Sequence, residues 1–165
     1  MPTHIVHTIP PVYDARSRVL ILGTMPSPKS REQGFYYGHP QNRFWRAIAA
    51  ALDEPEPRTV PEKRALVLRR GIALWDVLAS CDIEGASDAS IRNPVANDLT
   101  PILAAADIHA VFTTGRRAAA LYQTYIRPRT GLAALALPSP SPANCACSLD
   151  RLVEAYRAVL DYLED

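Results

Sequence analysis

The stretch Arg18-Val-Leu-Ile-Leu-Gly23, followed at once by Thr24-Met-Pro-Ser-Pro28, decides the fold expected for this chain. Its apolar run is short and continuous, which is typical of a parallel strand covered on both faces. Glycine and proline residues then end the strand. Open α/β sheets bind their ligands where the chain leaves the carboxyl end of a strand. We therefore expect a ligand site to begin at Gly23.

Strands and helices alternate along the rest of the chain. We expect further strands at 71–78, 109–114 and 132–137. Helices are predicted between and after the strands, at 42–52, 61–70, 99–106, 115–126 and 148–163. This alternation predicts a three-layer α/β/α sandwich with a central, mainly parallel four-stranded sheet, because parallel strands need crossover connections. We expect a single domain over residues 1–165.

Composition and charge exclude several classes of protein. Of the 165 residues, 48% are hydrophobic and 21% are charged, as in ordinary globular proteins. The apolar runs are too short to cross a membrane, and the first residues lack the pattern of a signal peptide. We therefore expect a cytoplasmic protein without a membrane partner. Because the net charge is only +1, binding to nucleic acid would require a local basic patch.

Basic residues gather in two parts of the sequence. One group surrounds the opening stretch and comprises Arg16, Arg18, Lys29, Arg31, Arg43 and Arg46. The other comprises Arg116, Arg117, Arg127 and Arg129. Both are candidates for phosphate binding, and scattered solvated charges are an equally good interpretation of the second group.

The cysteines and the commonest catalytic motifs do not account for the chain. Three cysteines, Cys81, Cys145 and Cys147, argue against a disulfide framework and cannot fill a four-cysteine cluster site. The opening stretch lacks both the P-loop and the dinucleotide-binding pattern, and no serine lies in a nucleophile elbow. We expect no metal and no cofactor. A small-molecule hydrolase or transferase on the same fold is an alternative.

Three motifs together resemble the uracil-DNA glycosylase superfamily. They are Gly23-Thr-Met-Pro-Ser27, Tyr37-Gly-His-Pro-Gln-Asn-Arg-Phe-Trp45 and Leu137-Pro-Ser-Pro-Ser-Pro-Ala-Asn144. The chain is most similar to the hypoxanthine (deoxyinosine) DNA glycosylases, and the second motif also resembles the mismatch-specific uracil enzymes. The resemblance implies a monofunctional, metal-free DNA-repair enzyme that flips a deaminated base out of damaged DNA and hydrolyses its N-glycosidic bond. Hypoxanthine is the expected base, and uracil or xanthine are alternatives.

The residue at position 25 departs from the related enzymes. Met25 stands where the mismatch-specific enzymes carry an asparagine that handles the attacking water, and the aspartate of the uracil enzymes is also missing. In the hypoxanthine branch the resemblance assigns the catalytic amide to Asn42 instead. An amide can orient water or bind a base oxygen without ionising. Helix capping is the alternative interpretation of Asn42.

The remaining expected site residues fall into two groups. Base binding is assigned to Gly23, Thr24, Met25, Tyr37 and Asn144. The backbone N–H groups of Gly23 and Thr24 would meet a base oxygen, and Tyr37 would stack on the base unless it merely packs against the sheet. DNA binding is assigned to His39, Arg92, Asn93, Ser139, Pro140 and Ser141.

The proline-rich loop 138–144 is expected to act as a wedge that keeps the flipped base out of the stack. An ordinary turn is the alternative for this loop. For the whole chain, the alternative to an enzyme is a non-catalytic nucleic-acid-binding module, which would follow if Met25 marks a lost activity. We expect a monomer whose partner is damaged DNA.

Overall fold

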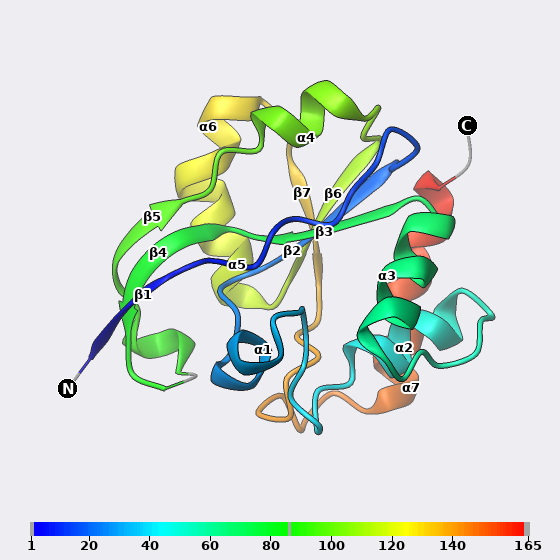
Figure 1. The fold of residues 1–165 in the computed structure, drawn as a ribbon, viewed down its shortest axis with the longest axis horizontal. Coiled ribbons are helices and arrows are strands. Elements are labelled where there is room, and N and C mark those ends of the chain that lie inside the picture. The colour runs from blue at the N-terminus through cyan, green and yellow to red at the C-terminus, as the bar shows by residue number, and fades with distance from the viewer. Residues whose placement is uncertain (1, 86, 164–165) are drawn as a thin grey trace.

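The central sheet consists of four parallel strands in the order β3-β2-β6-β7. Figure 1 shows this sheet in the computed structural model, which describes residues 2–85 and 87–163. The strands are β2 (Val19–Gly23), β3 (Ile72–Asp76), β6 (Ala110–Thr114) and β7 (Ala134–Leu137). The predicted α/β/α architecture with a four-stranded sheet is confirmed.

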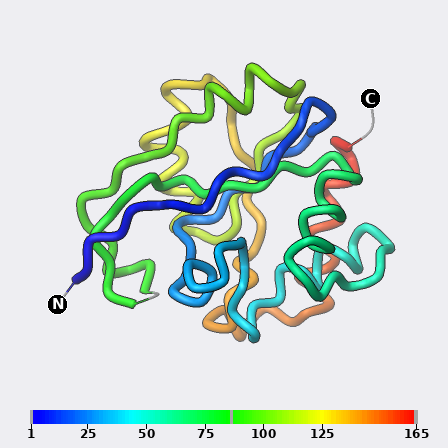
Figure 2. The backbone as a smooth tube through the Cα atoms, in the orientation of Figure 1, coloured from blue at the N-terminus to red at the C-terminus, as the bar shows by residue number. Residues whose placement is uncertain are grey.

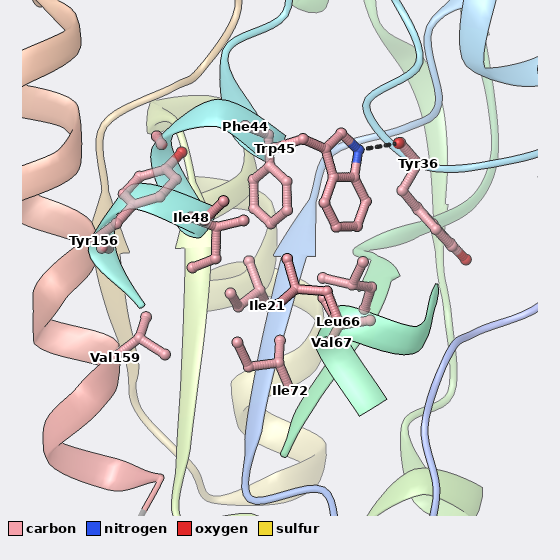
Figure 3. Close-up of a cluster of buried hydrophobic side chains, with 14 of the residues drawn as sticks. Ile21, Tyr36, Phe44, Trp45, Ile48, Leu66, Val67, Ile72, Tyr156 and Val159 are labelled. Carbon is pink, nitrogen blue, oxygen red and sulfur yellow. Dashed lines mark hydrogen bonds between the residues drawn. The ribbon is translucent and has the colours of Figure 1, made fainter. Parts of the chain in front are cut away.

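One face of the sheet is covered by helices from both halves of the chain. These are α2 (Phe44–Ala51), α3 (Val60–Arg69), α7 (Leu149–Tyr156) and the 3-10 helix η3 (Arg157–Tyr162) that continues α7. Ser148 caps the start of α7, because its side chain accepts a hydrogen bond from the backbone N–H of Arg151. Figure 3 shows Phe44 and Ile48 of α2 lying over Ile21 of β2, with Tyr156 of α7 beside them.

The other face is covered by helices and by a second sheet. The helical elements are α4 (Thr100–Ala105), α5 (Arg116–Leu121), the π-helical turn η2 (Tyr122–Ile126) and α6 (Arg127–Thr130). The second sheet is antiparallel and contains β1 (Thr3–Val6), β4 (Leu78–Ile83) and β5 (Arg92–Ala96) in the order β1-β4-β5. Leu20 and Leu22 of β2 are buried in the core on this side.

The segment 82–98, which carries the predicted DNA contacts Arg92 and Asn93, belongs largely to the antiparallel sheet. That segment contains the end of β4, the 3-10 turn η1 (Asp88–Ser90) and β5. Strand β5 includes a proline and mostly side chains that are not buried, so the sequence carries no apolar alternation to indicate a strand. Its pairing to β4, rather than its own composition, makes it a strand.

Two connecting segments meet at the carboxyl ends of the parallel strands. The first leads through α1 (Pro28–Gln33) to the start of α2, and the second joins β7 to α7. Figure 2 shows the cyan end of the first segment beside the orange second segment, and hydrogen bonds from Arg43 to Ser141 and Asn144 join them. Among the helices of the described ranges, none has the length and apolar character needed to span a membrane.

The core beneath α2 provides a test of the fold. Ile48 is completely buried, so Ile48→Ala should lower the free energy of unfolding by about 2–5 kcal/mol through lost apolar contacts and a residual cavity. Val95→Ala is the control, because Val95 is 55% exposed and its truncation should change stability by no more than about 0.5 kcal/mol. Urea denaturation measures both, and equal losses would contradict the placement of α2 over the sheet.

Candidate active site

The ends of three parallel strands form the floor of the candidate site. The register pairs Gly23 with Asp76, and the adjoining pair of Leu22 with Thr113 brings Thr114 to the other side of Gly23. A Cβ atom at Gly23 would lie 2.5 Å from Oδ1 of Asp76 and 3.6 Å from Oγ1 of Thr114. The glycine is therefore required by close approach, and its missing side chain leaves room between a carboxylate and a hydroxyl.

Tyr37 reaches the same place from the segment between α1 and α2. Its hydroxyl is 3.2 Å from Oγ1 of Thr114, and its ring stacks on Phe44 with 3.9 Å between the ring centroids. Its φ angle of 54° is left-handed, which a tyrosine adopts only where its surroundings hold it. Burial, and then the charge of Asp76, raise the pKa of Tyr37 well above its usual value. The phenol therefore stays neutral at physiological pH.

Asp76 is the charged group of the floor. The residue is 4% exposed, and Oδ2 of its carboxylate is 2.8 Å from Nε2 of His7. The sequence singled out neither residue, because Asp76 ends an apolar run and His7 lies far from it along the chain. The signal that could have identified Asp76 is an acidic residue at the end of a predicted strand. Its proximity to Gly23 becomes evident only once the pairing register of the strands is known.

Asn42 combines the two interpretations that the sequence left open. Its Oδ1 accepts a hydrogen bond of 2.9 Å from the backbone N–H of Phe44, the first residue of α2. Among the described residues its Nδ2 has no hydrogen-bond partner. The carbonyl thus caps the helix, while the amide nitrogen is available to donate to a ligand.

These residues line one cavity at the carboxyl edge of the sheet, which we call the base cavity. Eight residues singled out in the sequence contribute to it: Gly23, Thr24, Met25, Tyr37, Asn42, Ser139, Pro140 and Ser141. Residues that the sequence did not assign to the site also line it, among them Tyr36, Asp76 and Thr114. The carbonyl groups of Gly23 and Thr24 accept hydrogen bonds from Val77 and Leu78.

Asp88 lies at the rim, where it lines both the base cavity and a neighbouring groove. Its Oδ2 accepts a hydrogen bond of 3.5 Å from the Thr24 hydroxyl. Partial burial raises the pKa of the Asp88 carboxyl, the Thr24 hydroxyl and Arg117 lower it, and Asp76 raises it further. The cavity therefore has one carboxylate at its floor and one at its rim.

Arg43 joins the two segments that form the walls. Its guanidinium group donates hydrogen bonds to the main-chain carbonyls of Ser141, Asn144 and Cys147. Its backbone N–H donates to the carbonyl of Pro140 over 3.0 Å. Since Arg43 directly follows Asn42, these bonds fix the position of the proline-rich loop relative to the predicted catalytic amide.

The proline-rich loop is also held from within. The hydroxyl oxygen of Ser139 accepts from the backbone N–H of Ser141, and that of Ser141 accepts from Ala143. Asn144 donates from Nδ2 to the carbonyl of Ser139. Asn144, which was predicted to bind the base, therefore lies outside the base cavity and lines the adjacent groove instead.

Three residues predicted to bind DNA do not line the base cavity. His39 accepts at Nδ1 from the backbone of Gln41 and so orders its own turn. Arg92 and Asn93 lie on β5, where Asn93 donates to Asp82 over 2.8 Å. The polar segment that contains them reaches the base cavity through Asp88 instead.

A basic groove adjoins the base cavity. We call it the arginine groove, because Arg116, Arg117 and Arg151 line it together with Ser139, Ser141 and Asn144. Two of the four basic residues of the second sequence group thus lie at the site, whereas Arg127 and Arg129 are on α6. From the first group, Arg16 and Arg18 lie at the opposite end of β2, beside Arg69 and Arg70.

The described residues also include the thiols that the sequence raised as possible ligands. Cys81 is buried, Cys145 is exposed and Cys147 is partly exposed. Within residues 2–85 and 87–163, no group of three or more His, Cys, Asp or Glu side chains is arranged to hold a metal ion.

The close approach at Gly23 predicts an energetic coupling. Gly23→Ala should lower stability by about 1–3 kcal/mol, because the added methyl group would overlap Oδ1 of Asp76. In an Asp76→Ala background the same change should cost about 1 kcal/mol less, because the obstructing oxygen is gone. Urea denaturation of the wild type, both single variants and the double variant measures this coupling. Equal costs in the two backgrounds would contradict the described floor.

Comparisons with known proteins agree with this geometry. Residues 10–164 match the family model of the uracil DNA glycosylase superfamily. A hypoxanthine DNA glycosylase of Methanosarcina acetivorans is 33% identical over 143 residues, 86% of this chain and 90% of the relative. One of Methanosarcina barkeri is 36% identical over 92 residues, 55% of this chain and 58% of the relative. An NMR structure of a Methanosarcina acetivorans protein assigned to the uracil DNA glycosylases superposes with a TM-score of 0.82 at 30% identity, covering 99% of this chain and 100% of that one. The chain belongs to the uracil DNA glycosylase superfamily.

Proposed function

We propose that this protein is a monofunctional DNA glycosylase that removes hypoxanthine from DNA. The observation that carries the proposal is the base cavity, in which an acceptor carboxylate, an aromatic ring and an amide nitrogen meet at the carboxyl edge of the sheet. Relatives named hypoxanthine DNA glycosylase, one of them aligned over most of the chain, support it. We further propose that the protein is a monomer, that it is located in the cytoplasm, and that its partner is damaged DNA.

The polar groups of the cavity match the edge of hypoxanthine. This base presents a carbonyl oxygen at C6 beside a ring N–H at N1, whereas adenine presents an amino group beside an unprotonated nitrogen. A carboxylate only accepts hydrogen bonds, so Asp76 accepts the N1–H of hypoxanthine and is repelled by N1 of adenine. The backbone N–H group of Thr24 donates to the oxygen, Gly23 provides the space beside Asp76, and Met25 provides an apolar wall.

The aromatic and amide groups act on the base and the leaving charge. Tyr37 offers the flipped base a ring already supported by Phe44, and such stacking contributes about 1–3 kcal/mol. Hydrolysis breaks the bond between C1′ of the sugar and N9 of the base, and the electron pair leaves with the base. Water supplies a hydroxyl group to C1′ and a proton to the base. Nδ2 of Asn42 donates a hydrogen bond to the leaving base, on which negative charge develops.

The surroundings of the cavity suit a DNA strand with a flipped nucleotide. The loop that contains Ser139, Pro140 and Ser141 is stiffened by prolines and by Arg43, so it can fill the gap left by the base. The arginine groove begins at the same loop and would bind the phosphates of the flanking strand. His39, Arg92 and Asn93 stay predicted DNA contacts outside the cavity.

Base release tests the proposal directly. Duplexes with deoxyinosine, deoxyuridine or deoxyxanthosine should give alkali-labile sites after incubation with the protein, fastest for deoxyinosine. Asn42→Ser should lower turnover about 100-fold, because it removes the amide donor but keeps an oxygen that can cap α2. Asn42→Ala should be equally inactive and also lose about 1 kcal/mol of stability.

Two results would count against these roles. If Asn42→Ser turns over like the wild type, Asn42 is only a helix cap. If the wild type binds damaged duplex without releasing any of the three bases, the chain is a non-catalytic binding module.

The arginine groove predicts a salt-dependent contribution that is independent of the base. Arg116→Gln or Arg151→Gln should each reduce the slope of log affinity against log salt by about 0.9 per lost phosphate contact, for damaged and undamaged duplexes alike. Arg69→Gln is the control. The Arg69 guanidinium lies 2.8 Å from the Glu54 carboxylate, and this ion pair is remote from the arginine groove. Fluorescence anisotropy at several salt concentrations measures the slopes. An unchanged slope in both groove variants would exclude this groove as the phosphate track.

A further inference from the structure

We infer that His7 is a positioning residue of the base cavity, which holds Asp76 so that one carboxylate oxygen faces the base. The inference rests on the proposed function and extends the site to the amino-terminal segment. Nε2 of His7 lies 2.8 Å from Oδ2 of Asp76, and the two side chains are only 3% and 6% exposed. Oδ1, the other oxygen, is the atom that approaches Gly23. His7 thus occupies Oδ2, while Oδ1 lies beside Gly23 at the floor of the base cavity.

The fold fixes His7 on several sides. His7 directly follows β1, whose last residue Val6 is paired with Ser80 of β4. Its backbone N–H donates to the carbonyl of Ala79 over 2.8 Å. The ring packs against Tyr36 and Trp75, with 6.1 and 6.3 Å between the ring centroids. The antiparallel sheet therefore delivers the imidazole to the buried end of β3.

A buried carboxylate needs such a partner. Without a hydrogen-bond donor, an ionised carboxyl group in an apolar site takes up a proton or turns toward another donor. A donor on one oxygen holds the carboxylate in one orientation and leaves the second oxygen as an acceptor of fixed direction. Only in that state does Asp76 discriminate between a ring N–H and an unprotonated ring nitrogen.

The chain contains a matched pair outside the cavity. Nδ1 of His4 is 2.8 Å from Oδ1 of Asp82, but these side chains are 62% and 29% exposed. They join β1 to β4 within the antiparallel sheet, so they share the His–Asp chemistry with the inner pair but lie away from the base cavity. An effect that arises merely from losing a His–Asp contact should appear in both pairs.

Two amide substitutions at residue 7 distinguish the position of the hydrogen-bond donor from its mere presence. The amide nitrogen of glutamine reaches about as far as Nε2 of histidine, whereas that of asparagine stops near Nδ1. His7→Gln should therefore keep kcat/KM for deoxyinosine duplex within about threefold of the wild type, and His7→Asn should lower it about 100-fold. His4→Gln and His4→Asn should both behave like the wild type. Thermal unfolding of each variant controls for loss of fold.

Base discrimination provides a readout that a purely structural role does not affect. A duplex with N1-methyldeoxyinosine keeps the carbonyl but lacks the N–H. Wild type and His7→Gln should strongly prefer deoxyinosine over it, and in His7→Asn this preference should fall at least about tenfold. Equal rates for His7→Gln and His7→Asn, or an unchanged preference in His7→Asn, would overturn the role of His7.

A measurement on the wild-type protein covers the case in which the variants do not fold. Nitrogen-15 NMR should show the His7 Nε2 resonance shifting when a duplex with cleavage-resistant 2′-fluorodeoxyinosine binds, while the His4 resonance and an undamaged duplex show no such shift. Binding without a change at His7 would overturn the inference. If the wild type releases no deaminated base at all, the proposed function fails instead.

Discussion

The contact between Gly23 and the carboxylate of Asp76 constrains the whole site. Backbone pairing in the parallel sheet sets these two residues opposite each other, and no side chain fits at position 23 while Asp76 keeps its place. The charged group therefore belongs to rigid strands, and loops contribute the aromatic ring and the amide. This division places the acceptor precisely, while the bonds from Arg43 and those within the proline-rich loop hold the walls.

Asn42 and Tyr37 each have a structural role and also face the cavity. The carbonyl of Asn42 caps α2, and this very bond orients its amide nitrogen away from the helix. Tyr37 packs on Phe44 and still lines the cavity. A group that is held by its structural partner loses little further freedom when it binds a ligand, so stability and pre-organisation here come from the same contacts.

Much of the fold could be predicted from the sequence, because β2, β6 and β7 are apolar runs separated by helical segments and end where α/β sheets bind ligands. Gly23, Tyr37 and Asn42 lie in motifs with uncommon residues at fixed spacing. The pairing of His7 with Asp76 spans 69 positions and depends on β1 pairing with β4. Neither strand shows a distinct pattern, so this part of the site required three-dimensional coordinates.

The bonds from Arg43 have a consequence for how such a protein can diverge. They end on main-chain carbonyl oxygens of residues 141, 144 and 147, which every amino acid possesses. Side chains in the loop can therefore be exchanged during evolution while its anchorage to α2 persists. The loop can therefore change its side chains while its backbone stays anchored. Such changes could alter the preference for the bases and strands around a lesion without altering the cavity behind the loop.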